Sequence, residues 1–392
     1  MTSAVLDTKL ATIGETRMTW FRERMPIIQE INKNITNNQT FKDKVIAVCM
    51  HIEPKTGYWV EGLVNSGAKH VYLVGCVGTT KDDTAAYLST IEGLTVLGKS
   101  TDTYEDHIRY VHQVLENKID LFLDNGASFI IAHKELNLDW QPLGANEETR
   151  SGKLLIEQKN IETNYPICVI DDSPLKQLLE NYTGVGQSVV DGFMRATSLL
   201  VGGKKVLVIG YGYCGSGVAN KFKGMGAQTF VYDIDPLFQL KAKVEGHGVG
   251  TLEELLPICD VVITVTGHFD VLTNKHISLF KNGAIIANSG HYGFEIDVKG
   301  IKSSAKEISI IKKGVEKIEF ENKVIYLLEN ASPLNLSAGD GNPIEIMDLG
   351  LGLQTLCAVE IVERIEKLKK GLQPVPYEIT QNVSQITLDV LK

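Results

Sequence analysis

The sequence predicts an α/β protein built from two doubly wound parallel sheets. Apolar strand-like runs alternate with helix-like segments from residue 44 to residue 124, the pattern of parallel strands joined by crossover helices. A unit of strand, glycine turn, helix and strand spans Lys204–Pro236. A long helical segment, Val185–Val201, lies between these regions and is suited to connect two domains. The 392 residues suffice for about two or three domains with substantial cores.

Composition argues against several classes of protein. The net charge is −9 and the basic residues are scattered, which argues against a nucleic-acid partner. Met1–Leu10 lacks the apolar core of a signal sequence, and no apolar run approaches the roughly 18 residues of a membrane span. We therefore expect a cytoplasmic protein with no membrane partner. The six cysteines are dispersed without CxxC pairs, so we expect free thiols and no metal site.

The first half of the chain predicts the first sheet. Residues 8–40 are expected to be helical, and residues 44–51 form a buried strand that ends at His51. A helix follows near residues 59–66, and further strands are expected at residues 70–76 and 119–124. Ligands of open parallel sheets bind beyond the carboxyl ends of the strands. His51, Cys76 and residues 124–126 should therefore converge on one crevice.

The segment after residue 146 combines carboxylates, hydroxyls and a lysine. A strand over residues 166–170 leads to Pro174 and Lys176. If Pro174 begins a helix, Lys176 and Glu180 stand one turn apart and can form an ion pair. On spacing alone, a capped helix with a surface ion pair is the simpler interpretation, ahead of a catalytic role.

The glycine turn inside Lys204–Pro236 predicts a dinucleotide site. Gly210 permits the tight turn, Gly212 lets a pyrophosphate approach the backbone, and Gly215 lets the following helix pack closely. Asp233 stands where an acidic residue binds the adenosine ribose, and its charge would repel the 2′-phosphate of NADP. A glycine motif alone is weak evidence, but strand, helix and carboxylate agree here. We therefore predict bound NAD.

The remaining chain extends this second sheet. Strands are expected at residues 260–267 and 284–291 and near residues 308 and 324, followed by a glycine-rich turn at residues 335–342. Residues 347–370 predict a long helix, and a proline break at residues 374–376 precedes a polar tail.

Over nearly its whole length the chain resembles the S-adenosylhomocysteine hydrolase family. The matching blocks agree in order and spacing: Glu147–Thr149, Asp172–Lys176 with Asn181, Asp191-Gly192, Arg195–Thr197, Gly210–Gly217, Asp235-Pro236, Thr264–Gly267, Asn288–His291 and Asn335-Leu336. The resemblance implies an NAD-binding Rossmann domain, residues 184–342, inserted into a substrate domain of residues 1–183 and 343–375. Residues 376–392 would form a C-terminal tail. It also implies a homo-oligomer, either a dimer or a tetramer.

The reaction implied by the resemblance uses NAD to oxidise the 3′ position of a nucleoside thioether. Elimination of the 5′ thiol, addition of water and return of the hydride complete the cycle. Lys176 and Glu180 would handle the 3′ hydroxyl, Glu148 would bind the ribose hydroxyls, and His51 would act near the 5′ leaving group. The catalytic positions are His51, Asn125, Glu148, Lys176 and Glu180. The cofactor positions are Thr149, Ser151, Asn181, Gly210, Gly212, Tyr213, Cys214, Gly215, Asp233, Thr266, Gly267, Asn288 and Asn335. The substrate positions are Glu53, Lys55, Thr56, His291, Asp340, Asn342 and Met347.

Departures from the family pattern gather at the substrate positions. Asn125 stands where the family has a second acid, and Asp124 is a poor substitute because consecutive strand residues point to opposite faces. After the strand-end histidine the family has a threonine and then a glutamate that recognises adenine, whereas this chain has Glu53 and Lys55. Asn342 replaces a family histidine. We predict a base other than adenine, or a different polar group at its position.

Three interpretations remain open. The first is an NAD-containing hydrolase of a nucleoside thioether, either S-adenosylhomocysteine itself or a variant of it. The second is an enzyme that uses the same 3′ oxidation for elimination, epimerisation or dehydrogenation of another nucleoside or sugar. The third is a non-catalytic NAD-binding regulator, because substrate positions have changed while cofactor positions remain.

Overall fold

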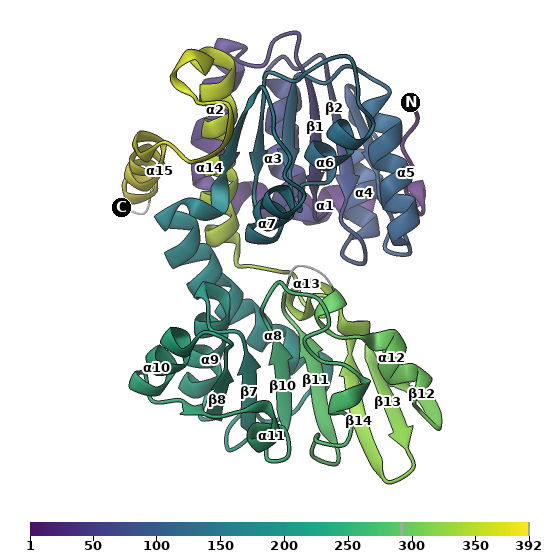
Figure 1. The fold of residues 1–392 in the computed structure, drawn as a ribbon. Coiled ribbons are helices and arrows are strands. Elements are labelled where there is room, and N and C mark those ends of the chain that lie inside the picture. Colours follow the sequence, from purple (N-terminus) through teal and green to yellow (C-terminus); the bar gives the residue numbers. More distant parts are fainter. Residues whose placement is uncertain (291–292, 391–392) are drawn as a thin grey trace. The chain divides into compact units, whose positions relative to one another are not determined.

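The computed structural model describes residues 1–290 and 293–390 and divides the chain into two compact units. The first unit comprises Met1–Lys176 and Ile344–Lys392, and the second comprises Gln177–Pro343. Residues 177–183, which the resemblance assigned to the first domain, belong to the second unit. Each unit is built on its own parallel-rich sheet, so the predicted fold class is confirmed (Figure 1).

The first unit has a seven-stranded sheet in the order β15-β6-β5-β4-β1-β2-β3, and every pairing in it is parallel. Its strands are β1 (Val45–Met50), β2 (His70–Gly75), β3 (Leu94–Leu97), β4 (Leu121–Asp124), β5 (Gly144–Glu147), β6 (Pro166–Val169) and β15 (Gly371–Pro374). Its helices are α1 (Ala11–Arg24), α2 (Pro26–Asn38), α3 (Pro54–Asn65), α4 (Asp82–Leu88), α5 (Tyr104–Leu115), α6 (Ser128–Glu135), α7 (Arg150–Gln158), α14 (Ile344–Glu363) and α15 (Tyr377–Val390).

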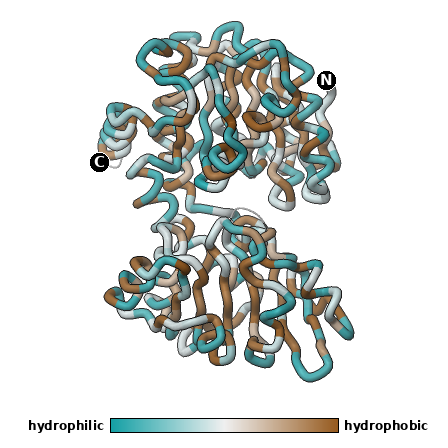
Figure 2. Tube along the Cα trace, in the orientation of Figure 1, coloured by the Kyte–Doolittle hydropathy of each residue, from teal (hydrophilic) through white to brown (hydrophobic). Residues whose placement is uncertain are grey.

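Helices cover both faces of this sheet, which explains why its strands are apolar along their length (Figure 2). On one face α2, α3, α14 and α15 pack against the strands, and on the other α5, α6 and α7 do. Helix α2 shows the local reasons: Pro26 opens it, and Ile27, Ile28, Ile31 and Ile35 form its buried stripe. The carboxylate of Asp348 on α14 accepts hydrogen bonds from the first backbone N–H groups of α2, those of Ile27 and Ile28.

The C-terminal region differs from the prediction of a polar tail. Residues 371–374 pair with β6 as an edge strand, a place where Pro374 removes no needed hydrogen bond. Helix α15 then contributes Ile379 and Val383 to the core of the first unit. This region therefore completes the first sheet and its cover.

The second unit has an eight-stranded sheet in the order β12-β13-β14-β11-β10-β7-β8-β9. Its strands are β7 (Lys205–Ile209), β8 (Gln228–Tyr232), β9 (Gly248–Val249), β10 (Val261–Thr264), β11 (Ala284–Asn288), β12 (Glu307–Lys312), β13 (Val315–Phe320) and β14 (Lys323–Leu328). Its helices are α8 (Val185–Thr197), α9 (Tyr213–Gly224), α10 (Pro236–Val244), α11 (Leu252–Leu255), α12 (Val298–Ser303) and α13 (Leu334–Ser337). A π-helix, Lys176–Gly184, precedes α8.

Several elements of the second unit were not predicted. Strand β13 joins β12 and β14 in an antiparallel meander at the sheet edge. The segment predicted as a turn at residues 335–342 begins inside the short helix α13. Helix α8 ends at Thr197, four residues before the predicted Val201. Strands β7, β8, β10, β11 and β14 form the parallel core and agree with the prediction, whereas the short strand β9 was not predicted.

Both sheets change winding direction between their first and fourth strands along the chain. In the first unit this point lies between β1 and β4, and in the second between β7 and β10. Ligands of doubly wound folds bind at such points, beyond the carboxyl ends of the strands. Within the described ranges, no helix is long and apolar enough to cross a bilayer.

Candidate active site and cofactor site

The turn after β7 has the backbone geometry of a dinucleotide cradle. Gly210 has a φ of +98°, and a Cβ on it would lie 2.5 Å from the carbonyl oxygen of Val265. A Cβ on Gly215 would lie 1.9 Å from the carbonyl oxygen of Gly210, so α9 starts directly against the turn. At Gly212 a Cβ would meet nothing within 4 Å, which leaves the start of α9 open to a phosphate. These residues fit NAD.

The neighbouring groups complete the cradle. Tyr213 and Cys214 form the first turn of α9, and the first turn of a helix is a place where backbone N–H groups can bind an anion. Asp233 follows β8 and accepts hydrogen bonds from the backbone N–H groups of Tyr211 at 2.6 Å and Asp235 at 2.9 Å. The carboxylate is thereby held at the strand end, where ribose hydroxyls can donate to it.

A buried carboxylate absent from the sequence analysis, Glu295, holds the loop after β10. It accepts hydrogen bonds from the Thr266 N–H at 2.8 Å, the Thr266 hydroxyl at 2.9 Å and the Gly267 N–H at 2.8 Å. Burial raises the pKa of Glu295 above its usual value, although these donors lower it. Thr266 and Gly267, two predicted cofactor positions, are therefore fixed beside the point where the winding changes.

Asn288 uses its whole amide to fix the loop after β11. Its Oδ1 accepts from the Thr264 hydroxyl at 3.0 Å and the Gly290 N–H at 2.9 Å. Its Nδ2 donates to the carbonyl oxygens of Gly290 at 3.2 Å and Ala331 at 3.0 Å. This side chain therefore shapes the loop. His291, a predicted substrate position, lies outside the described residues.

Asn335 and Asn342 are linked through Ser188, a buried residue of α8 that the sequence analysis missed. Nδ2 of Asn335 donates to Oγ of Ser188 at 3.2 Å, and Oγ of Ser188 donates to Oδ1 of Asn342 at 2.9 Å. Asp340 is largely exposed and lies 3.7 Å from the guanidinium of Arg195. Asn335 and Asn342 thus share one network, whereas the Asp340 carboxylate points to solvent.

Glu180 and Asn181 lie in the π-helix Lys176–Gly184. Helical structure begins at Pro174, as predicted, but the π-type backbone bonds then join residues five apart. The expected α-helical turn between Lys176 and Glu180 is therefore wrong, and residues five apart, such as Lys176 and Asn181, occupy successive turns. Single π-turns are rare and frequently occur at functional sites.

In the first unit, the strand ends bring His51, Cys76 and Asn125 together as predicted. Nδ1 of His51 lies 2.8 Å from the hydroxyl of Thr79, and Sγ of Cys76 donates to Oδ1 of Asn125 at 3.9 Å. Burial lowers the pKa of His51, but Cys76 and the carboxylates of Glu148 and Glu53 raise it by more. The imidazole therefore holds its proton to a higher pH than usual.

Asn125, Glu148 and Lys176 form one hydrogen-bonded line, and all three are buried. Nδ2 of Asn125 donates to Oε2 of Glu148, and Nζ of Lys176 donates to Oε1 at 2.8 Å. Burial raises the pKa of Glu148, but Lys176, His51 and Asn125 lower it by more. The line therefore offers an ionised carboxylate with an ammonium on one side and an amide on the other.

Glu147, the last residue of β5, holds two strand-end loops together. It accepts from the N–H groups of Gly126 at 3.0 Å, Ala127 at 2.7 Å and Thr149 at 2.8 Å, and from the Thr149 hydroxyl at 2.6 Å. Thr149 also caps α7, and Ser151 donates to its hydroxyl at 3.1 Å. The hydroxyls predicted to contact NAD at these positions thus already have partners inside the first unit.

Asp124 faces away from this line, as strand alternation predicted. Its carboxylate accepts from the N–H groups of Asn125 at 3.1 Å, Phe129 at 2.8 Å and Ile130 at 3.0 Å, at the start of α6. Burial raises the pKa of Asp124 to about 7 in spite of these bonds. Asp124 therefore supports the loop that carries Asn125 and is not aimed at Glu148.

The predicted base-recognition residues form a buried ion pair at the start of α3. Nζ of Lys55 lies 2.9 Å from Oε2 of Glu53, and these side chains are 2% and 6% exposed. Glu53 also caps the helix by accepting from the Lys55 N–H at 3.1 Å. The Thr56 hydroxyl beside them is buried and has no hydrogen-bond partner within residues 1–290 and 293–390. Met347, another predicted substrate position, belongs to the hydrophobic core of the first unit.

Comparison with known proteins identifies the family. Residues 181–341 match the model described as S-adenosyl-L-homocysteine hydrolase, NAD binding domain. S-inosyl-L-homocysteine hydrolase of Methanocaldococcus jannaschii is 34% identical over 391 residues, covering 99% of this chain and 94% of that protein. The chain belongs to the S-adenosylhomocysteine hydrolase family. It is therefore an enzyme with an NAD-binding domain.

Other members of the hydrolase family are equally similar. Adenosylhomocysteinase of Aquifex aeolicus is 35% identical over 398 residues, covering 99% of this chain and 94% of that protein. Among solved structures, dipicolinate synthase A chain of Bacillus subtilis is 14% identical with a TM-score of 0.43, covering 84% of this chain and 99% of that chain.

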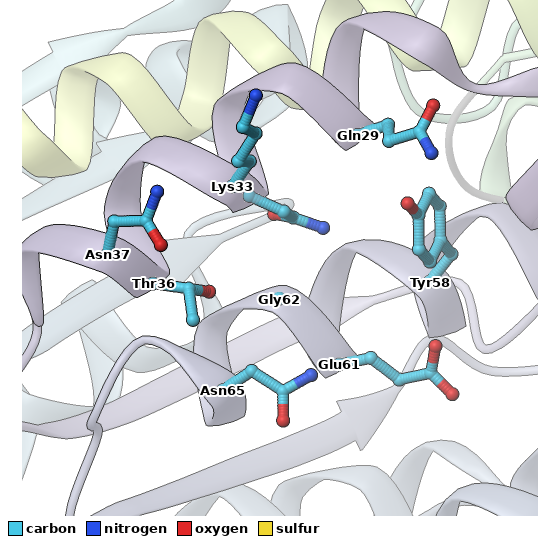
Figure 3. A pocket seen from close by; sticks show the side chains of 9 residues that line it. Gln29, Lys33, Thr36, Asn37, Tyr58, Glu61, Gly62 and Asn65 are labelled. Carbon is cyan, nitrogen blue, oxygen red and sulfur yellow. The ribbon is translucent and has the colours of Figure 1, made fainter.

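A cavity of about 380 Å³ between α2 and α3 stands apart from these positions (Figure 3). It is lined by Gln29, Asn32, Lys33, Thr36, Asn37, Tyr58, Glu61, Gly62 and Asn65. Glu61 there is already engaged by Arg22, whose Nε donates to it at 3.0 Å, and by the Tyr87 hydroxyl at 2.8 Å. None of the predicted site residues lines this cavity, so the hydrolase chemistry is not assigned to it.

Proposed function

We propose that this enzyme hydrolyses a purine nucleoside–homocysteine thioether by transient oxidation of the ribose 3′ carbon. When bound, NAD supplies the acceptor for the 3′ hydride and its later return. The hydrogen-bonded line of Lys176, Glu148 and Asn125 carries the proposal. It places a buried cation beside an ionised carboxylate, a pair suited to the two neighbouring hydroxyls of a ribose.

Each residue of the line has a distinct task in this proposal. Glu148 accepts hydrogen bonds from the ribose hydroxyls and takes the 3′ hydroxyl proton as the hydride leaves, and the ammonium group of Lys176 donates a hydrogen bond to the 3′ oxygen. Asn125 carries no transferable proton, so it orients Glu148 through its amide. His51, with its raised pKa, donates a proton to the departing 5′ sulfur and then removes one from the incoming water.

We infer that the base is a 6-oxopurine, such as hypoxanthine, rather than adenine. A 6-oxopurine presents an acceptor at O6 and a donor at N1, whereas adenine presents a donor at N6 and an acceptor at N1. Lys55 offers N–H donors where the family glutamate accepts from the adenine amino group, and Glu53 can accept from N1–H. The similarity values do not choose between the bases, because named relatives of both kinds are about equally identical to this chain.

The test compares S-inosylhomocysteine with S-adenosylhomocysteine as substrates of the purified enzyme loaded with NAD. Thiol release should show a kcat/KM at least about 100-fold higher for the inosyl compound. With the adenosyl compound, the amino group of adenine and the buried ammonium of Lys55 would both be donors and would face each other without an acceptor. Equal or faster cleavage of the adenosyl compound would refute the base assignment. Exchange of the 4′ proton in heavy water without thiol release would instead support other chemistry on the oxidised ribose.

The Lys55→Gln variant sharpens the test. A glutamine amide can present either its oxygen or its NH₂ to the base, and it can still donate to Glu53. The preference for the inosyl compound should therefore fall to less than about tenfold, and the temperature of thermal unfolding should fall as well, because Glu53 loses its buried cationic partner.

A further inference from the structure

Helix α9 presents Gly217 to the π-helix and to the start of α8. A Cβ on Gly217 would lie 2.0 Å from the carbonyl oxygen of Tyr182 and 2.8 Å from its carbonyl carbon. A Cβ on Gly186, in the first turn of α8, would lie 2.7 Å from the carbonyl group of Gly217. All of these are backbone atoms, so none can move aside without moving the chain. The π-helix and α8 are therefore held against α9 at backbone contact distance.

A hydrogen bond secures the same contact one turn further along α9. Nδ2 of Asn220 donates to the hydroxyl of Tyr182 at 3.2 Å and also lies 3.3 Å from Oε2 of Glu245. That carboxylate oxygen accepts from the hydroxyl of Tyr211 at 2.6 Å, and Tyr211 belongs to the glycine turn of the cofactor cradle. A continuous series of side chains thus joins the cradle to the π-helix.

We propose that Gly217 and the Tyr182–Asn220 hydrogen bond are positioning elements that fix Glu180 and Asn181 relative to the cofactor-binding helix. Glu180 and Asn181 immediately precede Tyr182, so any displacement of the Tyr182 carbonyl displaces them as well. Helix α9 then has two roles. Its N-terminus binds the cofactor phosphate, and Gly217 positions Glu180 and Asn181. The proposal rests on the proposed function, since it takes Glu180 and Asn181, to which the family resemblance gives roles at the 3′ hydroxyl and the cofactor, to act beside NAD during the oxidation.

The contact could instead serve packing alone, and the two roles predict different results. A packing contact affects thermal unfolding and NAD affinity together with the rate. A positioning contact affects the rate of the hydride step while the folded protein still binds NAD, because the cradle glycines Gly210, Gly212 and Gly215 are untouched.

The test uses the full chain with two variants and one matched control. Gly217→Ala inserts a methyl group against the Tyr182 carbonyl, and Tyr182→Phe removes only the hydroxyl. Gly224→Ala is the control, because Gly224 is also in α9 and a Cβ there would meet nothing within 4 Å. Each protein is measured for thermal unfolding, NAD affinity and the rate of cofactor reduction on mixing with inosine or adenosine. Hydrogen–deuterium exchange across residues 177–186 is followed with and without NAD.

Gly217→Ala should bind NAD within about threefold of the native affinity but reduce it about 100-fold more slowly, since a misplacement near 1 Å costs that much. Tyr182→Phe should slow the step about fivefold, and Gly224→Ala should change nothing. Added NAD should slow exchange in residues 177–186 of the native enzyme and the control, but not of Gly217→Ala. Unchanged rates in both variants, or NAD affinity falling in parallel with the rate, would overturn the proposal.

Two further outcomes of these experiments also decide for or against the positioning role. If Gly217→Ala does not fold, Tyr182→Phe decides, and a native rate in that variant counts against positioning. If neither nucleoside reduces the cofactor of the native enzyme, the proposed function fails. The exchange measurement still decides the contact, because equal protection of the native enzyme and Gly217→Ala would refute it.

Discussion

Glu148 is the residue on which the hydrogen-bonded line of the first unit depends. Its two carboxylate oxygens bind different partners, the ammonium of Lys176 and the amide of Asn125. A buried carboxylate is costly unless it is paired and hydrogen-bonded, so each partner is needed for Glu148 to remain ionised. The spacing of Lys176 and Glu180 suggested a local surface pair, but Lys176 is buried and bonds to a residue far away in the sequence.

Removal of Lys176 should expose this dependence. Lys176→Met leaves Glu148 as a buried charge without its ammonium partner and should lower the free energy of unfolding by about 3–5 kcal/mol. The double variant Lys176→Met/Glu148→Gln should recover most of the loss. Urea unfolding measures both, with Lys153→Met as the control, because its pair with Asp172 is more exposed and should contribute less than about 1 kcal/mol. A double variant no more stable than the single one would contradict the argument.

Single residues were predictable where their role is local. The positive φ of Gly210 and the approach at Gly215 follow from a short motif, because the turn itself imposes them. Glu147 and Glu295 were not predicted to hold backbone N–H groups, because their partners are loops from other strands. The adjacent carboxylates Glu147 and Glu148 indicated that a polar site lies nearby. The sequence does not show which of the two carboxylates faces that site.

Two glycines on either side of β7 distinguish two effects of an added methyl group, backbone strain and a steric clash. Gly210 follows the strand, and Gly203 precedes it. Gly210→Ala meets both a positive φ and a Cβ placed 2.5 Å from a carbonyl oxygen, so it should lower the free energy of unfolding by more than about 2 kcal/mol and abolish NAD retention. Gly203→Ala has a φ of +79° but open space, so it should lose only about 1 kcal/mol and keep NAD. Thermal unfolding and released nucleotide measure these outcomes; equal losses in both variants would mean that the contact with Val265 is unimportant.

The carboxylate that caps α2 should make stability depend on pH. Burial raises the pKa of Asp348 to about 7 from a usual value of 3.8, so the folded state binds the proton more tightly than the unfolded state. Its contribution is present below about pH 4 and is lost as the pH rises to about 7, with a slope of at most about 1.4 kcal/mol per pH unit. Asp348→Asn should flatten this slope in urea unfolding between pH 5 and 8. An unchanged slope would show that Asp348 is ionised throughout.

The elements that the sequence predicted are those with strong periodicity, such as β1, β7, α2 and α14. Strand β15 was missed because its residues, Gly371–Pro374, have low strand propensity and pair only through the backbone at a sheet edge. The π-helix was missed for a different reason. Its residues suit an α-helix, and the wider turn lies at backbone contact distance from Gly217, a contact that no local pattern contains.

For the molecule as a whole, each unit has its own hydrophobic cores and its own set of predicted site residues. Deleting residues 377–392 removes Ile379 and Val383 from the core of the first unit, as well as the hydroxyl contact of Thr380 with Ser173 at 3.2 Å. The first unit should lose about 3 kcal/mol or more, while the NAD-dependent rise in stability of the second unit persists. Calorimetry with and without NAD tests this. A loss of the NAD effect in the truncated chain would contradict it.

The pairing of β15 with β6 also sets an order for folding on the ribosome. The second unit is one continuous stretch, Gln177–Pro343, and can fold as soon as it has emerged. The first unit is synthesised mostly before it, yet β6 has no neighbour on its outer side until residues 371–374 are made. While the second unit is synthesised, the apolar parallel sheet of the first unit therefore has an open edge and lacks α14. We expect chaperones to bind the nascent chain until β15 and α14 have been made.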